Sequence, residues 1–231
     1  MNLAREARCL LRAGRHAVLS TLSQALPGYP FGSVVPYVLD AQAYPVVLVS
    51  RLAEHTRNIG ADPRVSFIVL AAGGEVQENA RVTYLGRALP LASPGVVENR
   101  YLRFFPAARE YRSQLDFDFF RIEPVTLRVI AGFAKAHWVS REAYAPPDGD
   151  LAAREEAVVA QLNSLPAQAL RALCGDRDNN PQQVEIIGID CDGFDMRADG
   201  DILRFDFDRC MPGADEACAA AESKVRSARA R

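Results

Sequence analysis

The sequence predicts an α+β protein with an N-terminal β-barrel or β-sandwich and a smaller C-terminal α+β domain. The first observation is a series of short β-branched runs, HAVLSTLS, GSVVPYVLD, PVVLVS and RVSFIVL, separated by Pro, Gly or Asp. The second is YAPPDG at residues 144–149, which disfavours continuation of a helix or strand. The third is a pair of Asp-Gly dipeptides, at 192–193 and 199–200, which are typical of hairpin turns.

The N-terminal part begins with a predicted helix, because residues 5–15 place Ala, Leu and Arg at helical spacing and Gly14 is a suitable stop. Ser93 and Pro94 indicate the start of another helix. Pro124 is expected between the last two barrel strands, at a bend or an edge position. After the β-branched runs, the predicted elements are a loop over 71–80, the strand RVTYLGRALPL, a helix over 96–105 and strands over 117–122 and 126–133.

The C-terminal part reads as a helix followed by three strands and a last helix. Val158, Leu162 and Leu165 fall at helical spacing, and Pro166 is expected to kink or divide that helix. The remaining segments are QVEIIGID, a D-G turn, DMRA, a second D-G turn, LRFDF and a helix over 215–231. A small sheet with helices on one face follows from this order.

Composition is that of an ordinary soluble globular protein. The 231 residues are 49% hydrophobic and 24% charged, with a net charge of −2. Such a balance gives no broad attraction to nucleic acid or to an anionic membrane. From this balance we expect small molecules or other protein subunits as partners. No apolar run approaches membrane-spanning length, so a soluble protein is expected.

The five cysteines do not form a recognisable framework. They are Cys9, Cys174, Cys191, Cys210 and Cys218, with no C-x-x-C pair. Because the sequence shows no export signal, reduced thiols and a cytoplasmic location are expected. Buried or incidental thiols are favoured over a reactive role.

A polar segment between two β-branched runs is the best candidate for a ligand site. Cationic and hydroxyl side chains gather where a strand ends and a helical turn is expected, which suits a phosphate. The alternative is that Thr56 caps a helix running toward Gly60 while the two arginines are solvated. The side chains concerned are Arg51, His55, Thr56, Arg57 and Asn58.

Several segments carry a family resemblance: GYPFGSVVPY from Gly28, SRLAEHTRN at 50–58, DPRVS at 62–66, DFDFFRIEP at 116–124 and AGFAKAHW at 131–138. Together they resemble the FMN-binding split-barrel superfamily that includes pyridoxamine 5'-phosphate oxidase, and most closely its haem-utilisation branch of HugZ and HutZ type proteins. The resemblance covers nearly the whole chain and specifies the fold better than the chemistry.

The resemblance implies a six-stranded split β-barrel with flanking helices over residues 1–143, a linker over 144–153 and an α+β domain over 154–231. It also implies a homodimer with ligand clefts shared between the barrels. The leading expectation is an FMN-binding, flavin-related oxidoreductase of unknown substrate.

The same resemblance suggests which residues would hold FMN. His55 stands where relatives have a lysine, and it is a weaker phosphate partner because imidazole is only partly charged at neutral pH. No catalytic residue is assigned. The phosphate and ribityl chain would contact Ser50, Arg51, His55, Thr56 and Asn58, and the ring would lie near Ser33 and Val35.

A haem-binding or haem-degrading protein is the alternative, and a ligand-free dimeric scaffold is the third. The haem-utilisation branch usually opens its C-terminal domain with His-Met-Asn-x-Asp-His, but Gln161 and Pro166 stand at the two histidine positions. Glutamine is a poor haem ligand, so His55 and His137 become the candidate ligands.

Two further expectations concern neighbouring residues. Asp116 and Asp118 lie where a carboxylate of that branch supports the histidine, and they are interpreted as strand-end or turn carboxylates. His137 and Trp138 are adjacent in a strand-like run, so one of the two is expected to point inward.

Motifs for other chemistries are absent from the sequence. DCDGFD at 190–195 lacks the distal Glu of a calcium loop, and hairpin turns explain it better. There is no P-loop, G-x-G-x-x-G, G-x-S-x-G or H-E-x-x-H pattern. No metal site is predicted.

Overall fold

The computed structural model describes residues 2–71, 73, 79–114, 116–130, 136–175 and 181–229. The chain divides into two compact units, Met1–Ala145 and Pro146–Arg231. We call them the barrel unit and the C-terminal unit.

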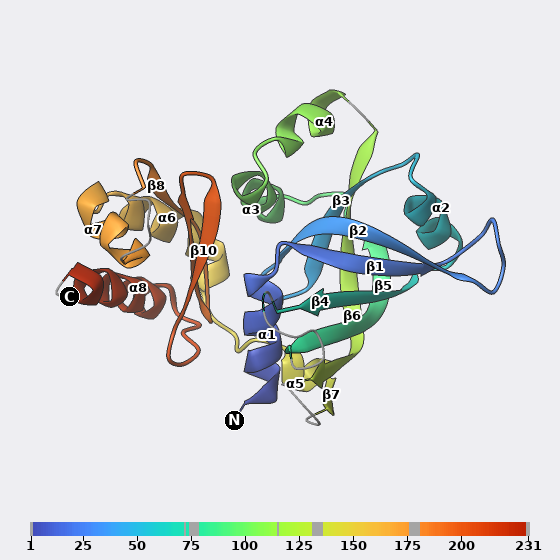
Figure 1. The fold of residues 1–231 in the computed structure, drawn as a ribbon, viewed down its shortest axis with the longest axis horizontal. Helices are drawn as coiled ribbons and strands as arrows, with labels where there is room; N and C mark the ends of the chain where they lie inside the picture. Colours follow the sequence, from blue (N-terminus) through green and yellow to red (C-terminus); the bar gives the residue numbers. More distant parts are fainter. Residues whose placement is uncertain are drawn as a thin grey trace. The chain divides into compact units, whose positions relative to one another are not determined.

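The barrel unit is built on one antiparallel sheet in the order β3-β2-β1-β4-β5-β6-β7 (Figure 1). β3 also pairs with β6, so six strands close into a barrel and β7 adds a seventh beside β6. The predicted six-stranded split barrel is therefore confirmed. The strands are β1 (His16–Leu22), β2 (Pro30–Leu39), β3 (Pro45–Ser50), β4 (Arg64–Leu70), β5 (Arg81–Pro90), β6 (Phe117–Ile130) and β7 (Ala136–Ser140).

Two of the barrel unit's helices lie at opposite ends of the barrel, α1 at one and α2 at the other (Figure 1). α1 packs Ala7 and Leu11 into the core and stops at Gly14. A Cβ atom at Gly14 would lie 2.5 Å from the Tyr37 hydroxyl, so lack of space requires the glycine. The helices are α1 (Leu3–Ala13), α2 (Glu54–Ala61), α3 (Val96–Phe104), α4 (Ala108–Gln114) and α5 (Arg141–Tyr144).

The barrel interior is filled by alternate residues of each strand. In β4, Val65, Phe67 and Val69 are buried while their neighbours are not. The Phe67 ring packs edge-on against Tyr37, with 4.8 Å between ring centroids, and also contacts Tyr84. The β-branched and aromatic pattern therefore specifies both the strands and the core.

The long strand β6 differs from the two strands that were predicted there. It runs without interruption through Pro124, because a register shift opposite Leu85 and Gly86 accommodates the proline. A Cβ atom at Gly86 would lie 2.4 Å from the Glu123 carbonyl oxygen. The expected strand end at residues 131–133 lies outside the described residues.

The predicted linker at 144–153 overlaps the ends of both units. Tyr144 is fully buried and ends α5, and its hydroxyl donates to the Ala43 carbonyl oxygen at 2.6 Å. Leu151 is buried too and begins α6. Within residues 144–153, all of which the structure describes, residues 145–150 are in neither a helix nor a strand, so the linker is shorter than predicted.

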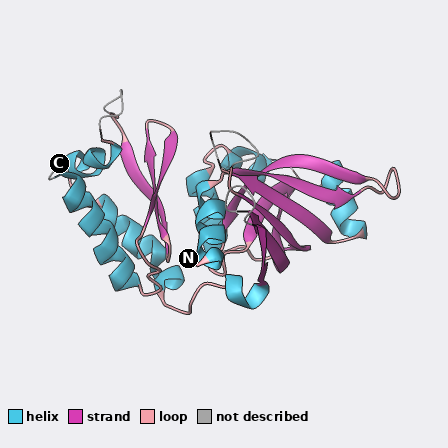
Figure 2. Ribbon diagram, turned by 60° about the horizontal axis from the view of Figure 1, so that its bottom comes forward, coloured by secondary structure: helices cyan, strands magenta, loops and turns pink. Residues whose placement is uncertain are grey.

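The C-terminal unit is a three-stranded sheet in the order β10-β9-β8, with helices on one face (Figure 2). A hairpin forms at each predicted Asp-Gly dipeptide. Asp199 and Gly200 are the turn residues between β9 and β10 and have positive φ values. Between β8 and β9 the turn residues are Cys191 and Asp192, and Gly193 is the first residue of β9. Pro166 separates α6 from α7, as predicted. The elements are α6 (Leu151–Asn163), α7 (Ala167–Arg171), η1 (Ala172–Cys174), β8 (Val184–Asp190), β9 (Gly193–Ala198), β10 (Asp201–Asp206) and α8 (Ala214–Arg229).

Among the described residues, no helix combines the length and the apolar character needed to cross a bilayer. All five cysteines lie in the described part of the chain, and none of them forms a disulfide there.

Candidate functional site

The predicted phosphate segment forms the turn from β3 into α2 at one end of the barrel. The Thr56 hydroxyl donates to the Ser50 carbonyl oxygen at 2.6 Å, and the Ser50 hydroxyl accepts from the Leu52 amide at 3.2 Å. The residue that caps α2 is Ala53, which makes no side-chain hydrogen bond. The Thr56 side chain therefore links the first turn of α2 to the end of β3 and does not cap the helix.

His55 and Ser33, predicted on separate segments, are brought together by the packing of α2 beside β2. His55 Nδ1 lies 3.1 Å from the Ser33 hydroxyl oxygen. Nε2 is shielded from solvent and has no hydrogen-bond partner among the described residues. Burial lowers the pKa of His55, so the imidazole is neutral at neutral pH.

Arg51 is bound to two carboxylates. Its Nε lies 2.5 Å from Asp118 Oδ2 and its Nη2 lies 3.0 Å from Asp118 Oδ1, while Nη1 lies 3.6 Å from Asp116. The hydrogen bond from Arg51 lowers the pKa of Asp118, so the pair stays ionised. One cation facing two carboxylates leaves this group with a net negative charge, which does not suit a phosphate. No motif or spacing in the sequence indicates this pairing of Arg51 with Asp116 and Asp118.

Asn58 has a structural role that differs from the predicted ligand contact. Its side chain is fully buried, and both ends of its amide are engaged. Oδ1 accepts from the Gln24 amide at 2.9 Å, and Nδ2 donates to the Thr21 hydroxyl at 2.9 Å. These bonds tie α2 to β1 and to the loop after it.

In β2, the backbone N–H and C=O groups that are open to a flavin ring are those of Val34, not those of Ser33 and Val35. The Tyr37 amide donates to the Arg15 carbonyl oxygen at 3.2 Å, and alternation along the strand directs the backbone groups of Ser33 and Val35 to β1 as well. The backbone N–H and C=O groups of Val34 point away from β1. Within the described chain no strand pairs with Val34 on that side, since β3 reaches only Tyr37.

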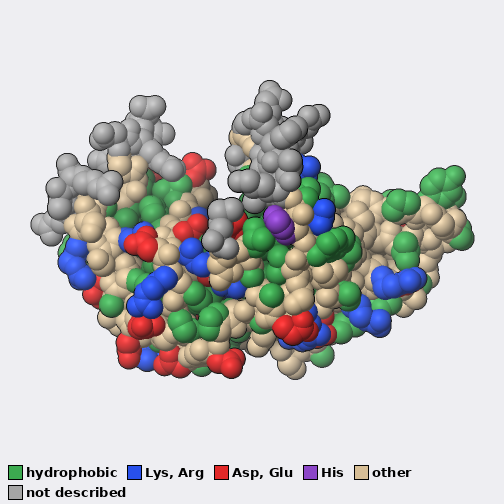
Figure 3. Space-filling model, turned by 90° about the horizontal axis from the view of Figure 1, so that it is seen from below, with side chains coloured by type: hydrophobic (Ala, Val, Ile, Leu, Met, Phe, Trp, Pro, Cys, Tyr) green, Lys and Arg blue, Asp and Glu red, His purple; other side chains and the backbone are tan. Residues whose placement is uncertain are grey.

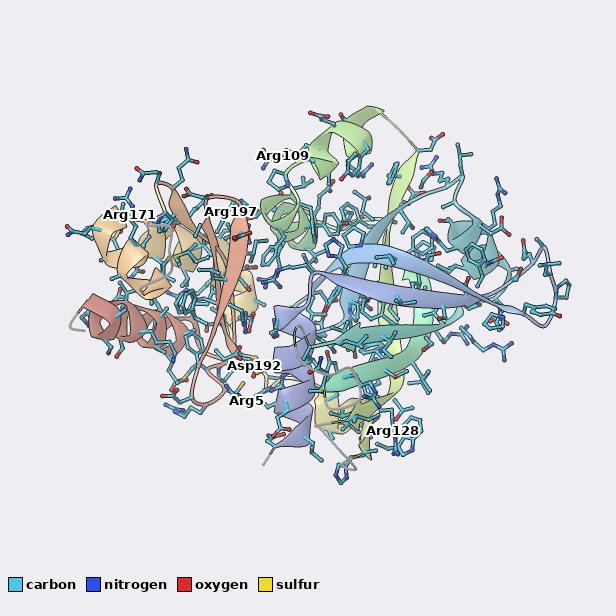
Figure 4. The ribbon with its side chains drawn as sticks, in the orientation of Figure 1. Arg5, Arg109, Arg128, Arg171, Asp192 and Arg197 are labelled. Carbon is cyan, nitrogen blue, oxygen red and sulfur yellow. The ribbon has the colours of Figure 1, made fainter. Side chains whose placement is uncertain are left out.

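The outer face of the barrel carries a row of side chains from neighbouring strands, most of which are apolar. Val34 is 72% exposed and Trp138 is 60% exposed, with the Arg128 guanidinium 5.2 Å from the indole centroid (Figure 4). Hydrophobic side chains also gather toward the tip of the β1–β2 hairpin (Figure 3). Successive strand pairs place in one row Val34, Val18, Ile68, Thr83, Arg128 and Trp138.

The prediction that His137 or Trp138 points inward is wrong. Both side chains are exposed on β7, and Val139 is the residue that packs into the core. Among the described residues, β7 pairs with β6 alone and lies at the edge of the sheet.

In the C-terminal unit, the residues that stand where relatives have the His-Met-Asn-x-Asp-His motif form hydrogen bonds within the unit. Gln161 Nε2 donates to Glu222 at 3.3 Å. Asn163 pairs with both backbone groups of Ile186, each at 2.8 Å, next to a bulge in β8.

Known proteins with similar sequences and folds agree with this architecture. The family model described as CREG, beta-barrel matches residues 1–146. The chloroplastic non-canonical heme oxygenase HOZ of Arabidopsis thaliana is 30% identical over 201 residues, which cover 84% of this chain and 62% of that protein. The chain therefore spans less than two thirds of that relative's length.

Two solved structures are similar along the whole chain. A heme binding protein from Mycobacterium smegmatis is 28% identical with a TM-score of 0.58, covering 100% of this chain and 99% of that one. A protein of unknown function from Agrobacterium tumefaciens is 24% identical with a TM-score of 0.76, covering 97% and 94%. The similarity to the Agrobacterium tumefaciens protein shows that the two proteins share a fold. With the family model covering more than half of its length, the chain belongs to the CREG beta-barrel family of the FMN-binding split-barrel superfamily.

Proposed function

We propose that this chain binds haem through its barrel unit and acts as a haem-degrading protein. The charge of the candidate site carries the proposal: His55 is neutral with Nε2 lacking a partner among the described residues, whereas Arg51 is held by two carboxylates. Neutral imidazole suits iron, and a compensated guanidinium suits a phosphate poorly. Two relatives whose names specify heme support the same choice.

His55 and His137 are the candidate iron ligands. His55 Nε2 is shielded in the single chain, so coordination there requires the imidazole to turn away from Ser33. His137 is already exposed on β7. In a haem-degrading enzyme haem is the substrate, and its iron supplies the oxygen chemistry; residues of this chain would hold and orient the ring.

Hemin titration of the purified protein tests the proposal. We expect a shifted Soret band at one hemin per chain, and loss of that shift in either His55→Ala or His137→Ala. His16→Ala is the matched control, because His16 is another exposed histidine of the barrel unit. No Soret shift in the parent protein, or a shift that survives in both variants, contradicts the proposed ligation.

FMN is the second candidate, because the open backbone edge at Val34 can hydrogen-bond to a flat ring. The hydroxyls of Ser33, Ser50 and Thr56 would then lie nearest the ribityl chain. Asp118→Asn removes one of the carboxylates that hold Arg51, so FMN affinity should rise in this variant if FMN is the ligand. Quenching of flavin fluorescence measures that affinity, and no quenching in either protein eliminates FMN.

A homodimer built on the outer face of β1, β2 and β4 accompanies the proposal. Val18, Val34 and Leu22 expose apolar surface there, and burying it against a second copy is favourable. Val34→Lys should yield monomers in light scattering and weaken hemin binding, whereas Val96→Lys, at an exposed position on α3, should do neither. A dimer that survives Val34→Lys contradicts this interface.

A ligand-free dimeric scaffold remains the alternative, and it predicts a dimer without a spectral response to hemin or FMN. We also propose a reducing compartment such as the cytoplasm, which is supported by five cysteines without a disulfide.

A further inference from the structure

We propose that the C-terminal unit binds a thiophilic divalent cation, with Zn²⁺ as the best match, through Cys191, Asp192 and Cys210. One donor atom from each residue, two sulfurs and a carboxylate oxygen, lies within 4.8 Å of the other two. Tetrahedral zinc holds sulfur at about 2.3 Å and carboxylate oxygen at about 2.1 Å, which places its ligands roughly 4 Å apart. Small side-chain movements are enough to bring these donors onto one ion.

The backbone around the three donors is fixed on both sides. The Met211 amide donates to the Cys191 carbonyl oxygen at 2.7 Å, and the Phe207 amide donates to the Asp192 carbonyl oxygen at 2.8 Å. These bonds fasten the loop that carries Cys210 onto the β8–β9 turn. A site whose ligands sit on fixed backbone loses little freedom when it binds an ion.

The β8–β9 turn also rests on a buried ion cluster. The carboxylate of Asp190 accepts from the Asp192 amide at 2.9 Å and from Arg204 at 2.6 and 2.8 Å. Asp192 lies at the lower end of the three-stranded sheet in the view of Figure 4. Asp190 and Arg204 would therefore act as the outer support that orients the ligand turn.

The donor set selects the class of ion. Two thiolates favour Zn²⁺ over Mg²⁺ and Ca²⁺, which take oxygen ligands, and the carboxylate disfavours Cu(I). Cys191 and Asp192 are buried, while Cys210 is partly exposed and gives the ion a route in. Because both thiols lose protons on binding, affinity should rise with pH. Three protein donors leave a fourth position for water or another ligand.

Cobalt and zinc titrations of the full chain test the site. Reduced protein stripped of metal should develop a thiolate-to-cobalt charge-transfer band at one equivalent of Co²⁺, and Zn²⁺ should abolish it. Cys191→Ser and Cys210→Ser should each remove the band, and Asp192→Asn should weaken binding by about tenfold or more. Cys218→Ala is the matched control, since it removes a thiol from α8 and should leave the band unchanged.

Circular dichroism first establishes that each variant is folded. A second measurement needs no variant: bound Zn²⁺ should protect Cys191 and Cys210, and no other cysteine, from alkylation mapped by mass spectrometry. The proposal is wrong if reduced protein gives no band, if the band persists in both serine variants, or if zinc protects neither thiol.

Discussion

The two units of the chain differ in how they satisfy their buried polar groups. The barrel unit packs its core with aliphatic and aromatic residues, and several of its buried polar side chains donate to backbone carbonyls, as Tyr84 does to Ile122 at 2.9 Å and Arg8 does to Tyr144 at 3.0 Å. The C-terminal unit buries Arg204 against Asp190 and Asp195, with Asp206 alongside. An apolar core tolerates changes that keep its volume, whereas a buried charge requires every one of its partners.

Arg204 shows how strict that requirement is. Burial by itself would lower its pKa, but the surrounding carboxylates outweigh burial and raise its pKa well above the ordinary value. The guanidinium therefore stays charged wherever the unit is folded. Removing one carboxylate leaves part of that charge without compensation.

Asp195→Ala should have the largest effect on stability. Its side chain is 1% exposed and lies 3.0 Å from Arg204, and breaking a buried ion pair costs about 3–5 kcal/mol. Urea unfolding followed by circular dichroism measures the loss. Arg226→Ala is the control, because its pair with Glu222 is on the surface of α8 and contributes only about 0.5 kcal/mol. Equal losses in the two variants would remove the distinction between buried and exposed pairs.

Leu127 tests the tolerance of the apolar core. It is fully buried in β6, so Leu127→Ala should cost about 2–5 kcal/mol through the cavity it leaves. Leu127→Met keeps the volume and should cost less than about 1.5 kcal/mol. Urea midpoints compare the two variants, and similar losses would show that the barrel core is as exacting as the ion cluster.

Asn58 is the barrel unit's own buried polar bridge. Asn58→Ala leaves the Gln24 amide and the Thr21 hydroxyl without this partner, which should destabilise the protein by about 1–3 kcal/mol. Hemin or FMN affinity, measured at a temperature where the variant is folded, should change little. A large loss of affinity in a fully folded variant would restore Asn58 as a ligand contact.

The smallest effect concerns pH. Because burial lowers the pKa of His55 in the folded protein, the unfolded chain takes up a proton first as the pH falls below about 6.5. Stability should therefore decrease from pH 6.5 downward until the folded-state pKa is reached. Urea midpoints at a series of pH values should show this decrease in the parent and in His137→Gln. His55→Gln should lack it, and an unchanged decrease there contradicts the assignment.

The sequence predicts the barrel well because strand alternation and turn residues are local signals. PVVLVS and RVSFIVL become β3 and β4, and a hairpin forms at or next to each Asp-Gly dipeptide. The family resemblance assigns Ser33 to the ring and His55 to the phosphate and ribityl chain of one ligand, and in the fold these two side chains lie within hydrogen-bond distance.

Contacts between residues that are far apart in the sequence could not be predicted from the sequence alone. Arg51 was expected to meet an anionic ligand, but the pairing of β3 with β6 sets it beside Asp118. The thiol of Cys210 lies close to the thiol of Cys191 because the chain turns back after β10. Residue type and spacing do not show which charges meet, so the fold could be predicted and the site only in part.

The closure of the barrel through β6 constrains how the chain can fold as it is made. β3 pairs with β6 from Val46–Arg121 to Ser50–Phe117, so its outer edge has no barrel partner until β6 has been synthesised. Until then the nascent chain presents an apolar strand with an open edge, the kind of surface that joins neighbouring chains during translation. Slow elongation between β3 and β6 should therefore lower the yield of soluble protein.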